Sequence, residues 1–400
     1  MNVKQAKKNV LLFLILLGLI SLLSDFTHEG ARSIYGPYLS LIGVSAFAIA
    51  FTSGLGEFIG QALRIITGVI ADKTKRYWTM MIVGYAINLL VIPLLMFVEA
   101  NVWQIAIVLI LLERVGKGIR APAKSALTSF TTQQLGVGKA FALQEVMDQI
   151  GAFLGPLFVY LILNLNQEGE LEGYRLAFGL LGIFAIMTLV ILVIAKVKYP
   201  NPDQFESQTV SVGFKGNKAF VLYMIAVVFL ALGFIDYPVL AYHIDATSMV
   251  DVVYIPLIYS LVMGVDAIAA LVFGILYDKK GVLSLIISTG ISILIAPLFF
   301  MLDGVVGLVS ALFFWGVAMG AQESVLKAVL ASLVSKDKRA TAYGIFYAVF
   351  GGAWFIGSLV VGALYEVNVT ALVLFTSLSQ LISMIILIVY HQYEVKKAIN

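Results

Sequence analysis

Two long apolar segments are separated by the stretch Gly68-Val-Ile-Ala-Asp72-Lys73-Thr-Lys75-Arg76, and a shorter copy, Gly274-Ile-Leu-Tyr-Asp278-Lys279, returns 206 positions later. In both copies a glycine precedes an aspartate by four positions, and a lysine follows at once. A short basic stretch between apolar segments is typical of a loop at the cytoplasmic face of a membrane. Its return after about half of the chain indicates a duplicated unit.

The composition of the chain predicts an integral membrane protein. Of its 400 residues, 61% are hydrophobic and only 12% are charged, and the mean hydropathy is +0.99. A soluble domain has about 45–50% apolar and about 25% charged residues. Because a water-soluble protein of this composition would expose large apolar patches, the bilayer is the expected solvent. The apolar runs are long and unbroken, which favours helices over the alternating strands of a barrel.

We predict twelve spanning segments, since a span needs roughly 20 apolar residues. They lie near 10–40, 44–70, 78–98, 102–125, 138–165, 173–196, 217–243, 250–277, 281–302, 304–334, 340–366 and 368–391. The lysine-rich start with its apolar run is similar to a signal peptide, but no clean cleavage site follows, and we expect it to remain as the first span.

A polar stretch from Lys196 to Lys218 divides the segments into two sets of six. We therefore expect one bundle from 1–198, a cytoplasmic linker over 199–215 and a second bundle from 216–400. The predicted fold class is an all-α membrane protein with twelve transmembrane helices, in two six-helix bundles related by pseudo-two-fold symmetry.

The basic residues predict the orientation. Alternate junctions hold most of them, including Lys73, Arg76, Lys196, Lys198, Lys279, Lys280, Lys336, Lys338, Arg339, Lys396 and Lys397. The opposite loops are short and acidic or neutral, as at Glu99 and Asp303. Because basic loops stay in the cytoplasm, we expect both termini there and a location in the cell membrane.

The sequence resembles the major facilitator superfamily over nearly its whole length. The stretch after Gly68 matches the best-known signature of that superfamily, although the usual glycine within the basic run is missing. Arg114-Val-Gly-Lys117-Gly118-Ile-Arg120-Ala-Pro122 is similar to its arginine-glycine signature in the fourth span. Gly151-Ala-Phe-Leu-Gly155-Pro156 is similar to the glycine-proline motif of its proton-coupled exporters, with Val159 and Tyr160 where paired glycines usually follow.

The resemblance implies a secondary transporter that works by alternating access, of the drug/proton antiporter-like branch. Proton-coupled export (efflux) of a small organic solute is the implied function. The resemblance also implies a cytoplasmic gate in which the loop aspartates latch the two halves. Its expected residues are Gly68, Asp72, Lys73, Arg76, Arg120, Gly274 and Asp278. Gly151, Gly155 and Pro156 form the expected helix-packing motif.

Ionisable residues within spans cost about 2.5–3.5 kcal/mol each by insertion scales, so each one needs a partner or a function. In the first span, Asp25, His28, Glu29 and Arg32 are spaced to share one helix face. We interpret this stripe as the wall of a water-filled cavity in which Asp25 or Glu29 takes a proton. A purely structural network between helices is the alternative.

Further candidates for the substrate and proton pathway lie in the fourth and fifth spans. Glu113 can pair with Lys117 one turn later. Arg120 and Lys124 lie nearer the cytoplasm, where their side chains can snorkel to the interface, so Arg114 is the better candidate for the cavity. In the fifth span, Glu145 and Asp148 share a face, and a cation of the fourth span is expected to neutralise one of them. Asp148 is the alternative proton carrier to Asp25.

The second half offers Asp236, Asp266 and Glu323 within spans. Glu323 can pair with Lys327, whereas Asp266 has no cation within a turn of its own helix. An amphipathic pocket is one interpretation of the aromatic residues Tyr237, Tyr259, Trp315, Tyr343, Tyr347 and Trp354, and packing or anchoring at the interface is the other.

No cofactor, metal or nucleic acid is expected. The chain has no cysteine and three histidines, and its Gly-Lys pairs lack the rest of a nucleotide-binding loop. The expected partners are a small-molecule substrate, protons or another cation, and membrane lipids, and we expect a monomer. Proton-coupled uptake of a small anionic or zwitterionic solute is the transport alternative. A non-transporting membrane sensor or a lipid-handling protein is the rival class, and an enzyme is not expected because no specific nucleophile and base are found.

Overall fold

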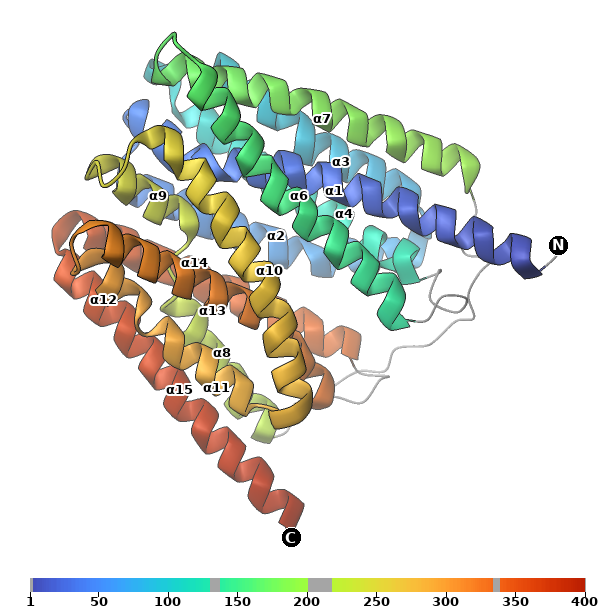
Figure 1. Cartoon of the computed structure of the whole chain (residues 1–400). Coiled ribbons are helices and arrows are strands. Elements are labelled where there is room, and N and C mark those ends of the chain that lie inside the picture. Colours follow the sequence, from blue (N-terminus) through green and yellow to red (C-terminus); the bar gives the residue numbers. More distant parts are fainter. Residues whose placement is uncertain (1–2, 130–136, 201–217, 334–338, 400) are drawn as a thin grey trace. The chain divides into compact units, whose positions relative to one another are not determined.

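The computed structural model describes residues 3–129, 137–200, 218–333 and 339–399, and for Asp72 and several helix ends it describes the backbone alone. All regular structure in these residues is helical (Figure 1). In chain order the longer elements are α1 (Val3–Leu41), α2 (Ala46–Thr74), α3 (Tyr77–Leu94), α4 (Gln104–Ser129), α6 (Val137–Leu165), α7 (Glu170–Lys198), α8 (Lys218–Leu232), α9 (Tyr237–Ala246), α10 (Ile255–Lys280), α11 (Leu283–Ser292), α12 (Ile295–Phe300), α13 (Gly304–Leu333), α14 (Arg339–Val367) and α15 (Val369–Ile399). Short 3-10 helices cover Leu95–Phe97, Ala100–Val102 and Val252–Tyr254.

Within the described residues, eleven helical segments are long and apolar enough to cross a membrane. They include α8 with α9, and α11 with α12, each pair counted as one segment. The twelfth predicted span is α4, which has 26 residues but carries five charged side chains. The predicted all-α membrane fold is confirmed, and the charges of α4 need protein partners rather than lipid around them.

The chain divides into two compact units, and each is described by itself. The first consists of Met1–Gly43, Ile59–Gln208 and Val252–Ser260, and the second of Val44–Phe58, Thr209–Asp251 and Leu261–Asn400. Thus α2 and α10 contribute residues to both units. The division into 1–198 and 216–400 stays a prediction, and most of the predicted linker, from residue 201 onward, lies outside the described residues.

In the first unit, α1 packs against α6 and α7, and α3 packs against α4 and α7 (Figure 1). The approach of α6 to α1 depends on glycine. A Cβ atom at Gly151 would overlap the carbonyl oxygen of Leu22, and one at Gly155 would overlap that of Phe26. Without side chains at these positions, the two backbones lie in direct contact, which brings their polar residues together.

In the second unit, α8 packs against α14 and α15, and α13 packs against α11 and α12. Between α8 and α9 the chain leaves the helix, and Asp236 caps α9 by accepting the backbone N–H of Tyr237 at 2.9 Å. The carbonyl of Ile235, freed by this break, accepts the indole N–H of Trp315 at 2.8 Å. The break is therefore compensated inside the protein, as a backbone at membrane depth requires.

A second break, between α11 and α12, has a proline as its cause. Pro297 has no N–H to donate to the carbonyl of Ile293, four residues earlier. The hydroxyl of Ser377 on α15 donates to that carbonyl instead, at 3.3 Å. A serine of a neighbouring helix thus replaces the missing helical hydrogen bond.

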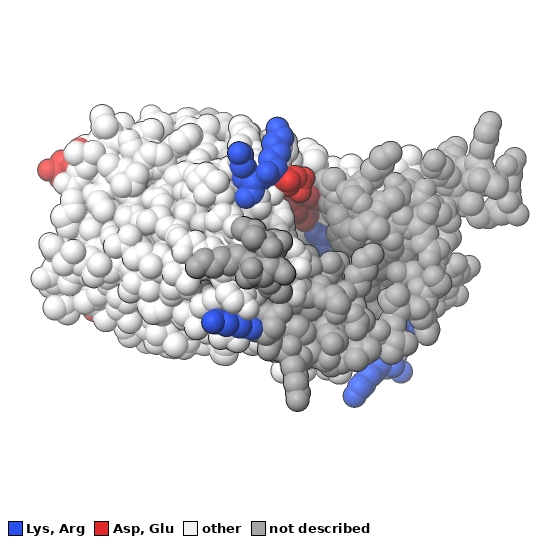
Figure 2. Space-filling view, turned by 90° about the horizontal axis from the view of Figure 1, so that it is seen from below, with Lys and Arg blue, Asp and Glu red and all other residues white. Residues whose placement is uncertain are grey.

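The outer surface of the helices is apolar. Leu271 of α10 and Val306 of α13 are 69% and 72% exposed, and many other large aliphatic side chains are exposed along α7, α10 and α15. On the face drawn in Figure 2, most of the described surface carries no charge. These side chains are in contact with lipid once the helices span a bilayer.

Candidate functional site: a charged network in the first unit

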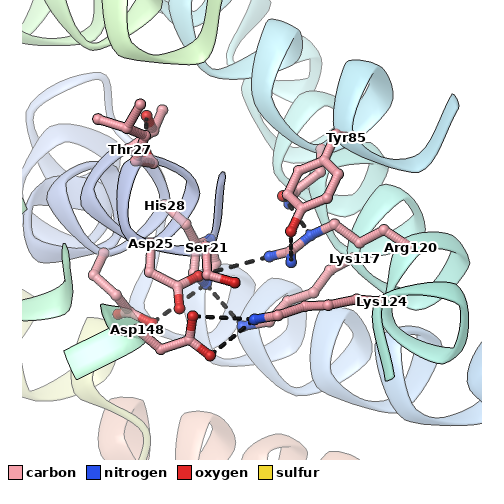
Figure 3. Close-up of polar contacts among 12 residues, drawn as sticks. Ser21, Asp25, Thr27, His28, Tyr85, Lys117, Arg120, Lys124 and Asp148 are labelled. Carbon is pink, nitrogen blue, oxygen red and sulfur yellow. Dashed lines mark hydrogen bonds and ion pairs between the residues drawn. The ribbon is translucent and has the colours of Figure 1, made fainter. Parts of the chain in front are cut away.

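The polar face of α1 lies against other helices of the first unit. His28 and Arg32 are buried, at 0% and 5% exposed, while Asp25 and Glu29 are half-buried. The predicted stripe along α1 thus meets protein, as its charges require. Its direct partners come from α4 and from Tyr259 at the start of α10, and Figure 3 shows Asp25 and His28 beside the cations of α4.

At the centre of the network, His28 contacts Glu113 of α4. The Nδ1 atom of His28 lies 2.9 Å from Glu113 Oε1, and its Nε2 atom lies 3.2 Å from the Lys117 ammonium and 3.5 Å from a guanidinium nitrogen of Arg114. Lysine and arginine only donate, so a neutral ring would accept at Nε2 and carry its proton on Nδ1, next to Glu113. The Nε2 atom also lies 3.5 Å from Glu29 Oε1. Glu113 also lies 3.3 Å from the Arg114 Nε.

Asn88 of α3 joins this centre to a second group. Its amide nitrogen donates to the backbone carbonyl of Glu113 at 3.0 Å and to the carboxylate of the same residue. Its amide oxygen accepts from Nε of Arg120 at 3.1 Å. Arg120 also donates to the Tyr85 hydroxyl at 3.2 Å, and its guanidinium lies 4.5 Å from the centre of the Tyr85 ring. Arg120 is therefore a buried residue of the network, whatever its part in a gate.

The carboxylate of Asp25 lies 3.7 Å from Arg120, which is longer than a hydrogen bond. On α6, Asp148 accepts from Lys124 at 2.8 and 3.0 Å. The predicted neutralisation of one α6 carboxylate by a cation of the fourth span is confirmed. Asp25 faces the same cations, so both carboxylates lie around Lys124 in Figure 3.

The outer arm of the network is Glu29 with Arg32, whose closest atoms are 3.5 Å apart. The hydroxyl of Tyr259, at the start of α10 and within the first unit, donates to Glu29 at 2.7 Å. In contrast, Glu145 is exposed on α6, and no contact found among the described residues joins it to the network.

The remaining pathway candidates lie in the second unit. Asp236 is buried and caps α9, and the Ser53 hydroxyl donates to its carboxylate. Asp266 is buried on α10, where Gly320 of α13 packs directly on it. Glu323 is half-buried on α13, and Lys327 is exposed. Their part in transport stays a prediction.

The predicted gate motif occupies the ends of α2 and α10. Lys73, Arg76 and Asp278 are exposed, whereas the side chain of Asp72 lies outside the described part of the structure. A Cβ atom at Gly274 meets no atom within 4 Å, and one at Gly68 meets Pro122 at an ordinary 3.8 Å. Neither glycine is needed for close packing, unlike Gly151 and Gly155.

Asn88 and Tyr85 are not among the residues predicted from the sequence, and Tyr259 is predicted only as one of the aromatic residues of an amphipathic pocket, not as a partner of Glu29. The only local signal for Asn88 is an amide inside an otherwise apolar helix. Among the described residues, no group of three His, Asp or Glu side chains is arranged to hold a metal ion. The network instead combines five cations, namely Arg32, Arg114, Lys117, Arg120 and Lys124, with four carboxylates.

The family model of the Major Facilitator Superfamily matches residues 14–358 and 219–399 of this chain. The chain belongs to the Major Facilitator Superfamily. An uncharacterised protein of Mycobacterium tuberculosis is 33% identical over 382 residues, covering 94% of this chain and 92% of that protein. An uncharacterised transporter of the superfamily from Methanocaldococcus jannaschii is 29% identical over 404 residues, covering 97% of this chain and 96% of the relative.

Solved structures of superfamily transporters share the fold. The nucleoside transporter NupG matches with a TM-score of 0.70 and 15% identity, over 95% of this chain and 98% of that one. The inward-open xylose transporter XylE from E. coli matches with a TM-score of 0.70 and 14% identity, over 94% of this chain and 95% of that one. The chain is thus a multi-pass membrane protein and a secondary transporter of small solutes, not an enzyme.

Proposed function

We propose that this superfamily member couples the movement of protons to the export of a small organic solute, with Asp25 as the proton carrier and Asp148 as its neighbour. The single observation that carries the proposal is how loosely Asp25 is held. Its contact with Arg120 is 3.7 Å, whereas Glu113 and Asp148 have partners within 3 Å.

A carboxylate can exchange a proton at low cost only if its cationic partner keeps other hydrogen bonds when the carboxylate becomes neutral. Arg120 keeps two of them, because Asn88 and Tyr85 stay bound to it when Asp25 is protonated. Asp25 also retains an exposed fraction of 20% in its side chain, which gives a proton access to it. Glu113, which is fully buried between His28 and Arg114, meets neither requirement.

Export as the direction rests on the glycine-proline motif of α6, which resembles that of proton-coupled exporters. In this chain Gly151 and Gly155 set the contact between α1 and α6, the two helices that carry Asp25 and Asp148. We also propose that the halves 1–198 and 216–400 alternate access to the solute, with both termini in the cytoplasm.

Purified protein in proteoliposomes that contain a pH-sensitive dye tests the proposal. A panel of small organic solutes is added, and solute-dependent proton movement is expected for the wild type. Asp25→Asn is expected to reduce it at least tenfold, and Asp148→Asn to reduce it less. Asp303→Asn, a change at an exposed carboxylate between α12 and α13, is the matched control. Full proton movement in both Asp25→Asn and Asp148→Asn would disprove the carrier assignment.

Uptake of a small anionic solute is the second candidate, and the excess of cations in the network favours it. Five cations face four carboxylates, so one positive charge is left over when all are ionised and His28 is neutral. If the solute is an anion bound by the outer arm, Arg32→Gln raises its KM at least tenfold. A KM unchanged by Arg32→Gln argues for the first candidate.

A further inference from the structure

Asn88 accepts from Arg120 of the Asp25–Arg120 pair and donates to Glu113 of the Glu113–His28 pair. It is fully buried on α3, and both its amide nitrogen and its amide oxygen are bonded. Through Arg120, this one amide thus connects the half-buried carboxylate of Asp25 with the fully buried carboxylate of Glu113.

The orientation of this amide is fixed by its neighbours. Arginine only donates and an ionised carboxylate only accepts, so a reversed Asn88 amide would lose both contacts at once. Its backbone is fixed as well, because a Cβ atom at Gly116 would overlap the Asn88 nitrogen and one at Gly84 would lie 2.7 Å from the Arg120 nitrogen. Asn88 cannot adapt to a new partner by turning or by sliding along α4.

We infer that Asn88 is a positioning residue that transmits the charge state of Asp25 to Glu113. This inference rests on the proposed proton exchange at Asp25. When Asp25 takes up a proton, Arg120 loses its carboxylate partner and binds the Asn88 oxygen more strongly. Polarisation of the amide then strengthens the donation from its nitrogen to Glu113, because hydrogen bonds in a chain reinforce one another.

Other charged groups around Asp25 and Glu113 also act on these two carboxylates. Asp25 faces Arg120, Lys124 and Lys117 from α4 and Asp148 from α6. Glu113 faces His28 and Tyr35 from α1, and Arg114 and Arg120 from its own helix. Among the contacts found, the Asn88 side chain bonds only to Arg120 and Glu113. Replacing Asn88 therefore removes the hydrogen-bonded connection between them without removing a charge.

A pH titration of the full-length protein by infrared spectroscopy tests the inference without any solute. The band of a protonated carboxyl group that disappears in Asp25→Asn reports the titration of Asp25. Glu113→Gln is expected to move the midpoint of this band. In the Asn88→Leu background, the same Glu113→Gln change is expected to move it by less than half as much. Equal shifts in the two backgrounds, or no band lost in Asp25→Asn, overturn the inference.

A second variant is needed where Asn88→Leu does not yield folded protein. Asn88→Asp would place a second carboxyl against Glu113, so a further apolar variant, Asn88→Ala, is used in its place; it can neither accept from Arg120 nor donate to Glu113, so the halved shift is again expected, and an equal shift again overturns the inference. Gln380→Leu is the control, because Gln380 is a buried amide of α15 that bonds to the Leu230 carbonyl and to no charged group in the contacts found. A halved shift in Gln380→Leu would show that loss of any buried amide is enough, and would overturn the inference.

Failure of this inference can be distinguished from failure of the proposed function. Proteoliposomes without solute-driven proton movement disprove the transport proposal, whereas the titration reports only the link between Asp25 and Glu113. Where the wild type does couple protons to solute, Asn88→Leu is expected to lower the ratio of protons to solute at least twofold. Asn88→Leu with an unchanged ratio contradicts the link.

Discussion

The ammonium group of Lys124 lies 2.8 Å from one carboxylate oxygen of Asp148 and 3.0 Å from the other. The two side chains join α4 to α6 and remain 17% and 24% exposed. An ion pair in this position is partly desolvated, so the charge of each partner is stabilised by the other more than it would be at a protein surface.

Lys124→Met is expected to lower the free energy of unfolding by about 1–3 kcal/mol, because it leaves a half-buried carboxylate without its cation. Thermal unfolding of the purified protein measures this loss. The double variant Lys124→Met with Asp148→Asn removes the stranded charge and is expected to recover at least half of it. Lys279→Met, at an exposed lysine, is the control. A double variant less stable than Lys124→Met contradicts the prediction.

Gly155→Ala is expected to lower the free energy of unfolding by about 1–3 kcal/mol, the usual effect of overpacking. The new methyl group would overlap the carbonyl of Phe26, and only a shift of α6 away from α1 relieves the overlap. Gly290→Ala is the matched control, since its methyl group meets the Met384 sulfur at an ordinary 3.5 Å. Unfolding temperatures of the two variants decide the matter, and equal values would refute the role of Gly155 in packing.

Two substitutions of Asp236 distinguish a structural role of this residue from a role in transport. Asp236→Ala is expected to lower the free energy of unfolding by about 1–2 kcal/mol, because the first N–H group of α9, that of Tyr237, loses its cap. Asp236→Asn keeps an acceptor at the same place and is expected to keep both stability and proton movement within twofold of wild type. Loss of proton movement in a stable Asp236→Asn protein would instead support the pathway role predicted from the sequence.

The absence of cysteine makes the predicted orientation directly testable. Lys280→Cys, between α10 and α11, is expected to react with a membrane-impermeant thiol reagent only from the cytoplasmic side. Asp303→Cys, between α12 and α13, is expected to react only from the outside. Both side chains are exposed in the structure. Labelling of both positions from the same side would rule out the predicted topology.

The spans were predictable because their apolar length is a local property of the sequence. The predicted segment 304–334 agrees with α13 at Gly304–Leu333, and 173–196 with α7 at Glu170–Lys198. The breaks before Tyr237 and Ile295 were not predicted. Pro238 and Pro297 follow them, but proline is tolerated in membrane helices, so it does not by itself predict where a helix stops.

The site was predictable only where charge reveals it. Asp25, His28 and Arg120 stand out in an apolar sequence, and the structure joins all three in one network. Asn88 and Tyr259 carry no charge, and Tyr259 is 230 positions from Glu29 in the sequence. Their contacts follow from the packing of distant helices, which spacing along a single helix does not describe.

The charges of α4 have a consequence for how the protein is made. A nascent helix with five ionised groups does not partition from the translocon into lipid by itself. Partners for Glu113, Lys117 and Arg120 lie in α1 and α3, which are synthesised earlier, but Lys124 is paired by Asp148 of α6, which emerges later. We therefore expect stable insertion of α4 to depend on α6, so that several helices of this region enter the membrane together rather than one at a time.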